Sequence, residues 1–116
     1  MGRIGGNIYG TLQVKNTKGL NYIGEAVTNW VDAVTSVYGW LDLTSGDSKY
    51  STYKAKIEES THTFLCDYNA DVYSFAGIDT RMVFKGFVYD VLLIDNPMEL
   101  NDHLEIYLKR VGAWNG

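Results

Sequence analysis

The sequence predicts a mostly β protein, a small antiparallel barrel of about five or six strands. Val, Ile and Thr supply 26 of the 116 residues, and nine tyrosines and three tryptophans add to them. Branched and aromatic side chains of this kind suit a pleated, half-buried surface. Several segments also alternate apolar and polar residues, which is the period of a strand with one buried face. Closing such a small sheet into a barrel would protect its edges.

Length and composition narrow the class of protein further. A chain of 116 residues has room for one domain. No apolar run approaches the roughly 20 residues of a membrane span, and the N-terminus lacks the apolar core of a signal peptide. The single cysteine, Cys66, excludes an internal disulfide and any Cys-based zinc site. We therefore expect one domain, 1–116, in a reducing compartment such as the cytoplasm, with no membrane partner.

The first 24 residues hold six of the twelve glycines. Because glycine adds little to a core, we expect a flexible arm over residues 1–24, with at most one short strand from Ile8 to Val14. The barrel core is then expected over residues 25–116, with an inserted loop at 44–60.

The segment from Asn29 to Leu43 alternates in a way that predicts a long strand, in which Gly39 would mark a bulge. The expected inner face is small and apolar, comprising Val31, Ala33, Thr35, Val37 and Leu41. The opposite face combines Trp30, Tyr38 and Trp40 with acidic residues. These aromatics could pack within the fold, stack on nucleic-acid bases as in an OB-fold, or anchor a protein interface. We favour the interface, with internal packing close behind.

A turn is expected at Thr44–Asp47, followed by a polar stretch to Ser60 that fits one short helix or an exposed loop. Alternation resumes from Thr61 to Asn69, which predicts a strand. Its shared face carries His62, Phe64, Cys66 and Tyr68. The connector from Ala70 to Asp79 has no pattern that assigns its form.

The strongest local signal is a β-hairpin. Apolar runs at Met82–Phe84 and Phe87–Ile94 flank Lys85-Gly86, where Gly86 would supply a positive φ. The second run is apolar on both faces, as in a central strand, and ends at Asp95-Asn96-Pro97. After a loop at 98–102, the segment His103–Val111 alternates again. Leu104, Ile106 and Leu108 are predicted to point inward, and Glu105, Tyr107 and Lys109 outward.

Charge and reactive residues give little support for catalysis or nucleic-acid binding. The net charge is −4, and the second half of the chain carries most of the acidic excess, which disfavours general binding to phosphates. His62 and Cys66 are four residues apart on a strand face, and His103 is distant, which is not a metal-ligand pattern. We expect no enzyme activity, no metal and no cofactor.

The order of segments resembles the head-tail joining family of tailed bacteriophages, the small head-completion or stopper proteins of the neck. The similar segments are a Trp-containing strand that leads to a Ser-Gly-acid turn, a Thr-rich strand, a hairpin with a basic-Gly turn, and a hydrophobic last strand. In this sequence they are Tyr38–Tyr50, Ser60–Tyr68, Met82–Pro97 and His103–Val111. The resemblance covers about residues 28–111.

The resemblance implies structural work in the virion neck, in a protein assembled in the host cytoplasm. Such a protein forms a homo-oligomeric ring below the portal and its adaptor, completes the head, docks tail proteins and closes the channel. Double-stranded DNA would pass without sequence-specific binding. The implied channel loop is Thr44, Ser45, Gly46, Asp47, Ser48, Lys49 and Tyr50, and the implied subunit contacts are Trp30, Tyr38, Trp40 and Tyr107. The alternatives are a tail terminator ring and a single-stranded nucleic-acid-binding barrel.

Overall fold

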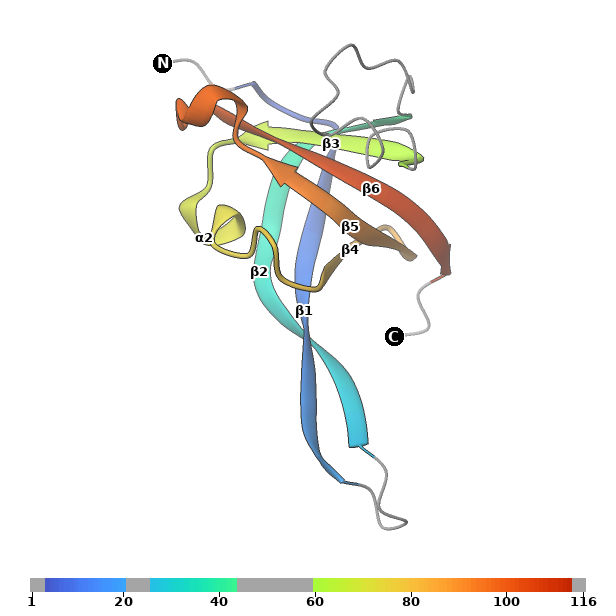
Figure 1. Ribbon diagram of the computed structural model, residues 1–116. Helices are drawn as coiled ribbons and strands as arrows, with labels where there is room; N and C mark the ends of the chain where they lie inside the picture. The colour runs from blue at the N-terminus through green and yellow to red at the C-terminus, as the bar shows by residue number, and fades with distance from the viewer. Residues whose placement is uncertain (1–3, 21–25, 44–59, 114–116) are drawn as a thin grey trace.

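A computed structural model describes residues 4–20, 26–43 and 60–113, and it confirms the predicted small antiparallel barrel. Six strands close in the order β1-β2-β3-β6-β5-β4, with every neighbouring pair antiparallel (Figure 1). The strands are β1 (Ile8–Leu20), β2 (Ala26–Leu43), β3 (His62–Asp67), β4 (Thr80–Phe84), β5 (Phe87–Asp95) and β6 (His103–Ala113). Closure leaves no free sheet edge around the barrel wall, which protects strands that would otherwise pair with other chains.

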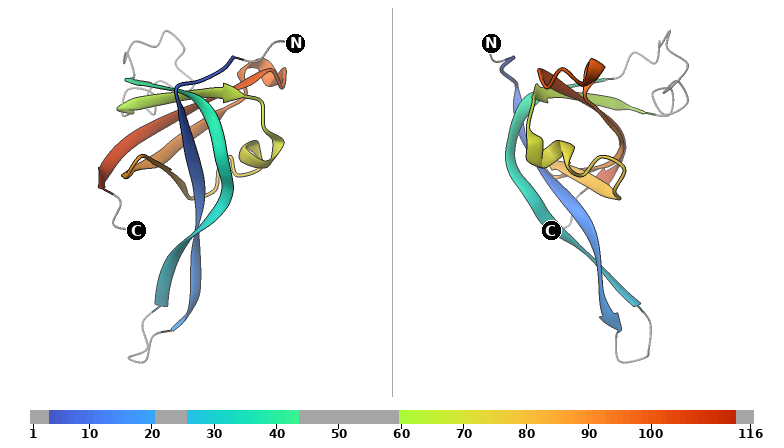
Figure 2. Two further views of the ribbon diagram at one scale, coloured as in Figure 1. Left: turned by 180° about the vertical axis from the view of Figure 1, so that it is seen from behind. Right: turned by 60° about the vertical axis from the view of Figure 1, so that its left-hand side comes forward.

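The outer part of β1 and β2 leaves the barrel as a two-stranded hairpin. Pairing of β1 with β4 ends at Val14 opposite Thr80, and pairing of β2 with β3 starts only at Gly39 opposite Cys66. Between these points and the far end of the hairpin, β1 and β2 pair only with each other. The hairpin therefore extends well beyond the barrel wall, as both views of Figure 2 show.

The prediction of a flexible arm over residues 1–24 was wrong for the described part of that segment. β1 is a strand of the barrel wall, and the side chain of its residue Leu12 is completely buried in the interior. Two described glycines of this segment, Gly6 and Gly10, permit close approach between parts of the fold. A Cβ added at Gly10 would lie 2.3 Å from Cε1 of Phe84, so the glycine lets the aromatic ring rest against the backbone. At this position the glycine therefore reflects close packing and not a linker.

The long strand β2 contains irregularities that shift its faces. Gly10 pairs with Val37, but Leu12 pairs with Val34, so β2 carries an extra residue there, and Ser36 has a positive φ of 56°. This bulge breaks the predicted inner row: Thr35 is exposed, whereas Val34 packs against the core.

The predicted bulge at Gly39 was wrong, because this glycine permits a close approach instead. Gly39 pairs in register with Cys66 of β3. A Cβ at Gly39 would lie 2.3 Å from the carbonyl oxygen of Leu65 and 2.8 Å from Cζ of Phe64. The missing side chain lets β3 and the Phe64 ring lie directly against β2.

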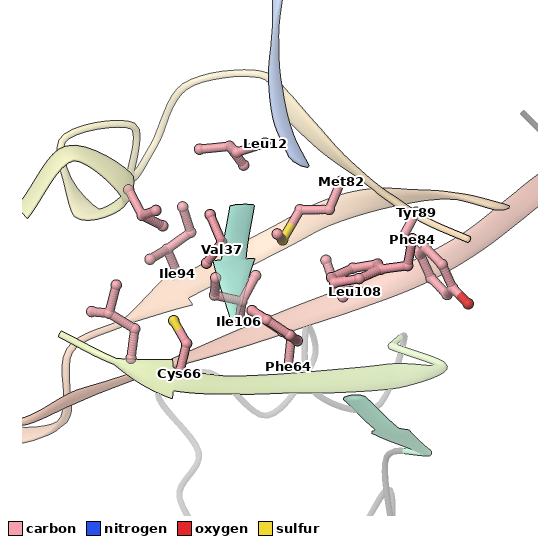
Figure 3. Packing of buried hydrophobic residues seen from close by; sticks show 12 residues of the cluster. Leu12, Val37, Phe64, Cys66, Met82, Phe84, Tyr89, Ile94, Ile106 and Leu108 are labelled. Atoms are coloured by element: carbon pink, nitrogen blue, oxygen red, sulfur yellow. The ribbon is translucent and has the colours of Figure 1, made fainter. Parts of the chain in front are cut away.

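The core fills the barrel interior with side chains from all six strands and from one connector. Its buried members are Leu12, Val37, Phe64, Cys66, Val72, Met82, Phe84, Tyr89, Ile94, Leu104, Ile106 and Leu108. Figure 3 shows the labelled members pointing toward one another across the interior. The rings of Phe64 and Phe84 lie 4.9 Å apart between centroids. The predicted inward positions on β6 are confirmed, since Leu104, Ile106 and Leu108 are fully buried.

The predicted hairpin at Lys85-Gly86 is confirmed as the link between β4 and β5. Lys85 has a φ of 42° and Gly86 a φ of 83°, so both central residues of the turn are left-handed. Two positive φ values are the signature of a type I′ turn, whose twist matches that of the flanking strands. Phe84 and Phe87 close the ladder directly beside it.

The connector between β3 and β4 contains the short helix α2 (Ala70–Tyr73), which the sequence pattern did not assign. The side chain of Asn69 caps it by accepting hydrogen bonds from the backbone N–H groups of Asp71 and Val72, at 3.0 and 3.2 Å. Val72 then inserts into the core. A second short turn, η2 (Pro97–Glu99), links β5 to β6. Across the described ranges, no helix is long and apolar enough to cross a membrane.

Candidate assembly surface

An exposed aromatic patch lies on the outer face of β1 and β2. Tyr9 and Tyr38 pair across the two strands, and their ring centroids are 4.5 Å apart. Trp40 follows two residues after Tyr38 on the same face. The three side chains are 63%, 42% and 41% exposed, respectively. Large aromatic side chains exposed together in this way are typical of protein-interaction surfaces.

Residues 4–7 lie along β2 and are tied to this patch. Trp40 Nε1 donates a hydrogen bond to the carbonyl oxygen of Ile4 at 2.8 Å, and the Tyr38 hydroxyl donates to that of Gly6 at 2.7 Å. The backbone N–H of Ile4 in turn donates to Asp67 Oδ1 at 3.0 Å. The polar atoms of both aromatics are therefore satisfied within the chain, and their rings remain exposed.

Asn7 fixes the end of the same segment. Its Oδ1 atom accepts a hydrogen bond from the backbone N–H of Leu41 at 3.0 Å, and its own backbone N–H donates to the carbonyl oxygen of Gly39 at 2.8 Å. The chain's own barrel therefore holds residues 4–7 in place.

Trp30 lies apart from the aromatic patch, at the root of the projecting hairpin. Cζ of Arg81 lies 4.5 Å from its ring centroid. Arg81 Nε donates to Gln13 Oε1 at 2.7 Å, and Gln13 Nε2 donates to Asp32 Oδ1 at 2.9 Å. Register places Asp32 beside Gln13 and Gln13 beside Arg81, so the contacts run across β2, β1 and β4. They join the base of the hairpin to the barrel wall.

Tyr107 lies on the outer face of β6 within a polar cluster. Its hydroxyl donates to Glu105 Oε1 at 2.9 Å, while the second carboxylate oxygen, Oε2, lies 3.0 Å from His103 Nε2. Burial and the Glu105 carboxylate raise the pKa of Tyr107. Burial, and to a smaller extent Glu105, also raises the pKa of Asp95.

The register of the sheet relates this cluster to the aromatic patch. Glu105 pairs with Leu65, which pairs with Trp40. The sheet therefore links Tyr107 to the aromatic patch.

Of the four predicted contact residues, Tyr38 and Trp40 come together, Tyr107 lies on the same outer wall, and Trp30 lies elsewhere. The predicted channel loop, Thr44 to Tyr50, lies outside the described residues, as does the predicted helix or loop up to residue 59. The strands that flank it are described: Leu43 pairs with His62 at the end of the β2–β3 ladder.

The two ends of the barrel carry exposed apolar residues that the sequence pattern did not reveal. The loop after β5 exposes Met98 and Leu100, which are 88% and 67% exposed. The other end exposes Phe87 and Val111, and Cζ of Arg110 lies 3.9 Å from the centroid of the Phe87 ring. In the sequence, the exposed apolar loop is indicated only by Met98 and Leu100, two large apolar residues among the polar residues of 96–102.

The loop at Met98 has a strained backbone. Met98, Glu99 and Asn101 have positive φ values of 53°, 53° and 56°. Side chains other than glycine and asparagine rarely adopt this region, and such conformations persist only where surrounding contacts impose them. Here the side chain of Asn96 accepts from the backbone N–H of Asn101 at 3.1 Å, and its Nδ2 donates to Asn101 Oδ1 at 2.8 Å.

Little in the described part of the chain suggests catalysis. The Cys66 thiol is buried, and burial raises its pKa to about 12, so it is a core residue and not a nucleophile. Among the described residues no cluster of His, Cys, Asp or Glu could hold a metal ion. A shallow hollow of about 240 Å³ lies between residues 75–79 and 91–94, and Asp79 is its only ionisable lining residue.

No known protein family matches the chain, and no curated protein matches it either.

Proposed function

We propose that this chain is a structural protein of the tailed-phage neck, which forms a ring below the portal and adaptor, completes the head and joins it to the tail. The exposed aromatic patch of Tyr9, Tyr38 and Trp40 is the observation that carries the proposal. It lies on a closed barrel wall whose interior is filled, so it is available to another protein and not to the chain's own core. The order of sequence segments supports the phage assignment by resemblance.

The projecting hairpin supports the same proposal. A two-stranded arm that reaches beyond a small barrel gains little from its own core, and arms of this kind are suited to contacts with neighbouring subunits. The net charge of −4 supports a channel wall that would not retain the DNA passing through it. Under this proposal, Thr44 to Tyr50 forms the channel gate.

The test is co-assembly with the portal and adaptor proteins encoded in the same genome. The full-length chain should co-purify with the portal–adaptor complex and appear as an added ring in electron micrographs. Tyr9→Ser should weaken that binding by on the order of tenfold, because Tyr9 is exposed and its hydroxyl makes no hydrogen bond to the described residues. Ile78→Ser is the matched control, since Ile78 is 50% exposed but lies away from the patch. No added ring on the portal–adaptor complex would refute the proposal.

The gate has a separate test. Replacing residues 44–50 with a glycine-serine linker of equal length should leave ring assembly intact. Filled heads completed with that variant should lose DNA to added nuclease, whereas heads completed with the unmodified chain should protect it. Equal protection by both chains would remove the gate from the proposal.

A tail terminator ring is the alternative within the same class, and binding to isolated tail tubes in preference to the portal complex would favour it. A single-stranded nucleic-acid-binding barrel is less favoured, because acidic side chains lie near the aromatic patch and would repel phosphate groups. These residues are Asp42 on β2 and Asp67 on β3. Retention of a labelled oligonucleotide on a filter at low salt, lost at high salt, would support it.

A further inference from the structure

We infer that the two ends of the barrel are complementary docking surfaces, so that the Met98–Leu100 loop of one copy packs against the Phe87–Val111 end of a second copy. The inference rests on the proposed function, because it names the contact through which such a ring would close. The occupant of each surface is thus another copy of this chain.

The first surface lies where β3 and β5 end and β6 begins. Met98 and Leu100 are the most exposed large apolar residues at this end. The two connections that form it, residues 67–73 and 95–105, contain no lysine or arginine. They carry instead the acidic residues Asp67, Asp71, Asp95, Glu99, Asp102 and Glu105. This end, the acidic end, therefore combines an apolar centre with an acidic surround.

The second surface lies at the other end of the same strands, at the β4–β5 turn and the last residues of β6. It exposes Phe87 and Val111, which are 38% and 62% exposed. Among the described residues, the exposed charged side chains near this end are three cations, Lys85, Lys109 and Arg110, and one acid, Asp90. Arg110 lies over the Phe87 ring. This end, the basic end, also has an apolar centre, but its net flanking charge has the opposite sign.

The two ends cannot lie on one face of the molecule. β6 begins at His103 in the acidic end and finishes at Ala113 in the basic end, so the length of the barrel separates them. Figure 1 shows the loop before β6 and the C-terminal end of β6 on opposite sides of the barrel. A two-fold dimer would place identical patches together, acid against acid. Opposite charges favour a head-to-tail contact, which repeats around a ring when the rotation between successive copies closes.

The hydrogen bonds between Asn96 and Asn101 prepare the acidic end for such a contact. They hold the loop in its left-handed backbone conformation, which keeps Met98 and Leu100 exposed in solution. A rigid apolar loop loses less conformational entropy on binding than a flexible one. Apolar centres with charged rims are also the usual composition of protein interfaces.

Directed cross-linking tests the head-to-tail geometry. Met98→Cys and Val111→Cys are prepared as separate full-length proteins and mixed under a mild oxidant at low salt. The native Cys66 does not interfere, because it is buried. We expect the mixture to form the 98–111 disulfide dimer at least tenfold faster than either variant forms a dimer alone, and high salt to slow it. Equal rates in all three samples would overturn the inference.

Charge reversal tests the complementarity. Lys85→Glu with Arg110→Glu makes both ends acidic, and Glu99→Lys with Asp102→Lys places two cations beside Met98 and Leu100 in the acidic end. Each double variant should lose self-association in sedimentation velocity by on the order of tenfold, and a one-to-one mixture should regain it. Lys15→Glu, an exposed cation at the hairpin root, is the control and should associate like the unmodified chain. Circular dichroism melting confirms that each variant is folded.

The outcomes separate this inference from the proposed function. If the mixture of Met98→Cys and Val111→Cys does not cross-link preferentially and the unmodified chain does not self-associate, or if the mixed charge-reversal variants fail to recover, the docking surfaces are refuted even where a ring forms on the portal complex. If the head-to-tail contact forms but no portal complex is bound, the docking surfaces stand and the neck assignment fails.

Discussion

The guanidinium of Arg81 lies over the indole ring of Trp30, with 4.5 Å between Arg81 Cζ and the ring centroid. This contact joins β4 to β2 at the point where the hairpin leaves the barrel, although the two strands are not neighbours in the wall. Gln13, buried between them on β1, accepts a hydrogen bond from Arg81 Nε. One arginine side chain thus satisfies a buried amide and covers an aromatic ring.

Removing that side chain should destabilise the fold. Arg81→Ala leaves Gln13 Oε1 without its donor and removes the cation–π contact, so we expect the free energy of unfolding to fall by about 1–3 kcal/mol. Urea denaturation followed by tryptophan fluorescence measures it. Lys15→Ala, an exposed cation on β1, should change stability by no more than about 0.5 kcal/mol. Equal losses in the two variants would show that the Arg81 contacts contribute nothing.

Gly39 should not tolerate a side chain. The added Cβ of Gly39→Ala would meet the Leu65 carbonyl oxygen at 2.3 Å, and backbone cannot move aside as a flexible side chain can. We expect a loss of about 1–3 kcal/mol from overpacking, measured by thermal and urea denaturation. Gly112→Ala is the matched control, because a Cβ there would have nothing within 4 Å. A neutral Gly39→Ala would contradict the close approach of β3 to β2.

Replacing Thr80 should stabilise the fold, in contrast to the substitutions at Arg81 and Gly39. Its Oγ1 atom is buried and has no hydrogen-bond partner in the described parts of the chain. Thr80→Val replaces the hydroxyl with a methyl group of similar shape, so the free energy of unfolding should rise by about 1 kcal/mol. Thr63→Val is the control, because Thr63 does have an interaction partner, and this variant should not be stabilised. Destabilisation by Thr80→Val would mean that the hydroxyl is satisfied in solution.

The Cys66 thiol should be inert in the folded protein. Burial, with a smaller contribution from Asp67, raises its pKa to about 12, and only the thiolate reacts with disulfide reagents. At pH 8 we expect labelling by a chromogenic disulfide reagent to be very slow in native buffer and rapid in denaturing urea. Raising the pH to 9 should increase the native rate by up to about tenfold, because the thiolate fraction grows with pH below the pKa, and labelling should still be far slower than in urea. Stoichiometric labelling within minutes in native buffer would place the thiol at the surface.

Asp95 should make stability fall slightly as pH rises. Burial and Glu105 raise its pKa in the folded protein, while His103 opposes them, so ionising Asp95 disfavours the folded state. This penalty begins as pH rises through about 3.9, the ordinary value for aspartate. Asp95→Asn should therefore stabilise the protein at pH 7 by up to about 0.5 kcal/mol and lose that advantage at pH 3. Denaturation midpoints at both pH values, with Asp42→Asn as an exposed control, measure the difference.

Local sequence patterns predicted the barrel well wherever a strand keeps a regular period. Between residues 104 and 108 of β6 every second residue is apolar, and the structure buries Leu104, Ile106 and Leu108. The Lys85-Gly86 dipeptide indicated its turn because two positive φ values favour such residues. Tyr38 and Trp40 were likewise predicted on an outer face, and both are exposed. In each case the signal lies within a few neighbouring residues.

The predictions were wrong or missing at positions where contacts between distant segments of the chain determine the structure. Gly10 and Gly39 looked like a linker residue and a bulge, but they are glycines because Phe84 and β3 lie against them. Similarly, nothing near Trp30 in the sequence indicates that Arg81 covers it. The exposure of Met98 and Leu100 depends on an Asn96–Asn101 pair that forms only once the loop is folded.

The sequence by itself determined the class of fold, the turn at Gly86 and the alternation that fills the barrel, because side-chain period and turn chemistry are local properties of the chain. Only the tertiary structure decided that β1 belongs to the wall, that its hairpin with β2 leaves the barrel, and that exposed apolar residues with opposite charge around them lie at the two ends. Those features depend on which strands become neighbours when the sheet closes, and strand pairing joins residues that are far apart in the chain.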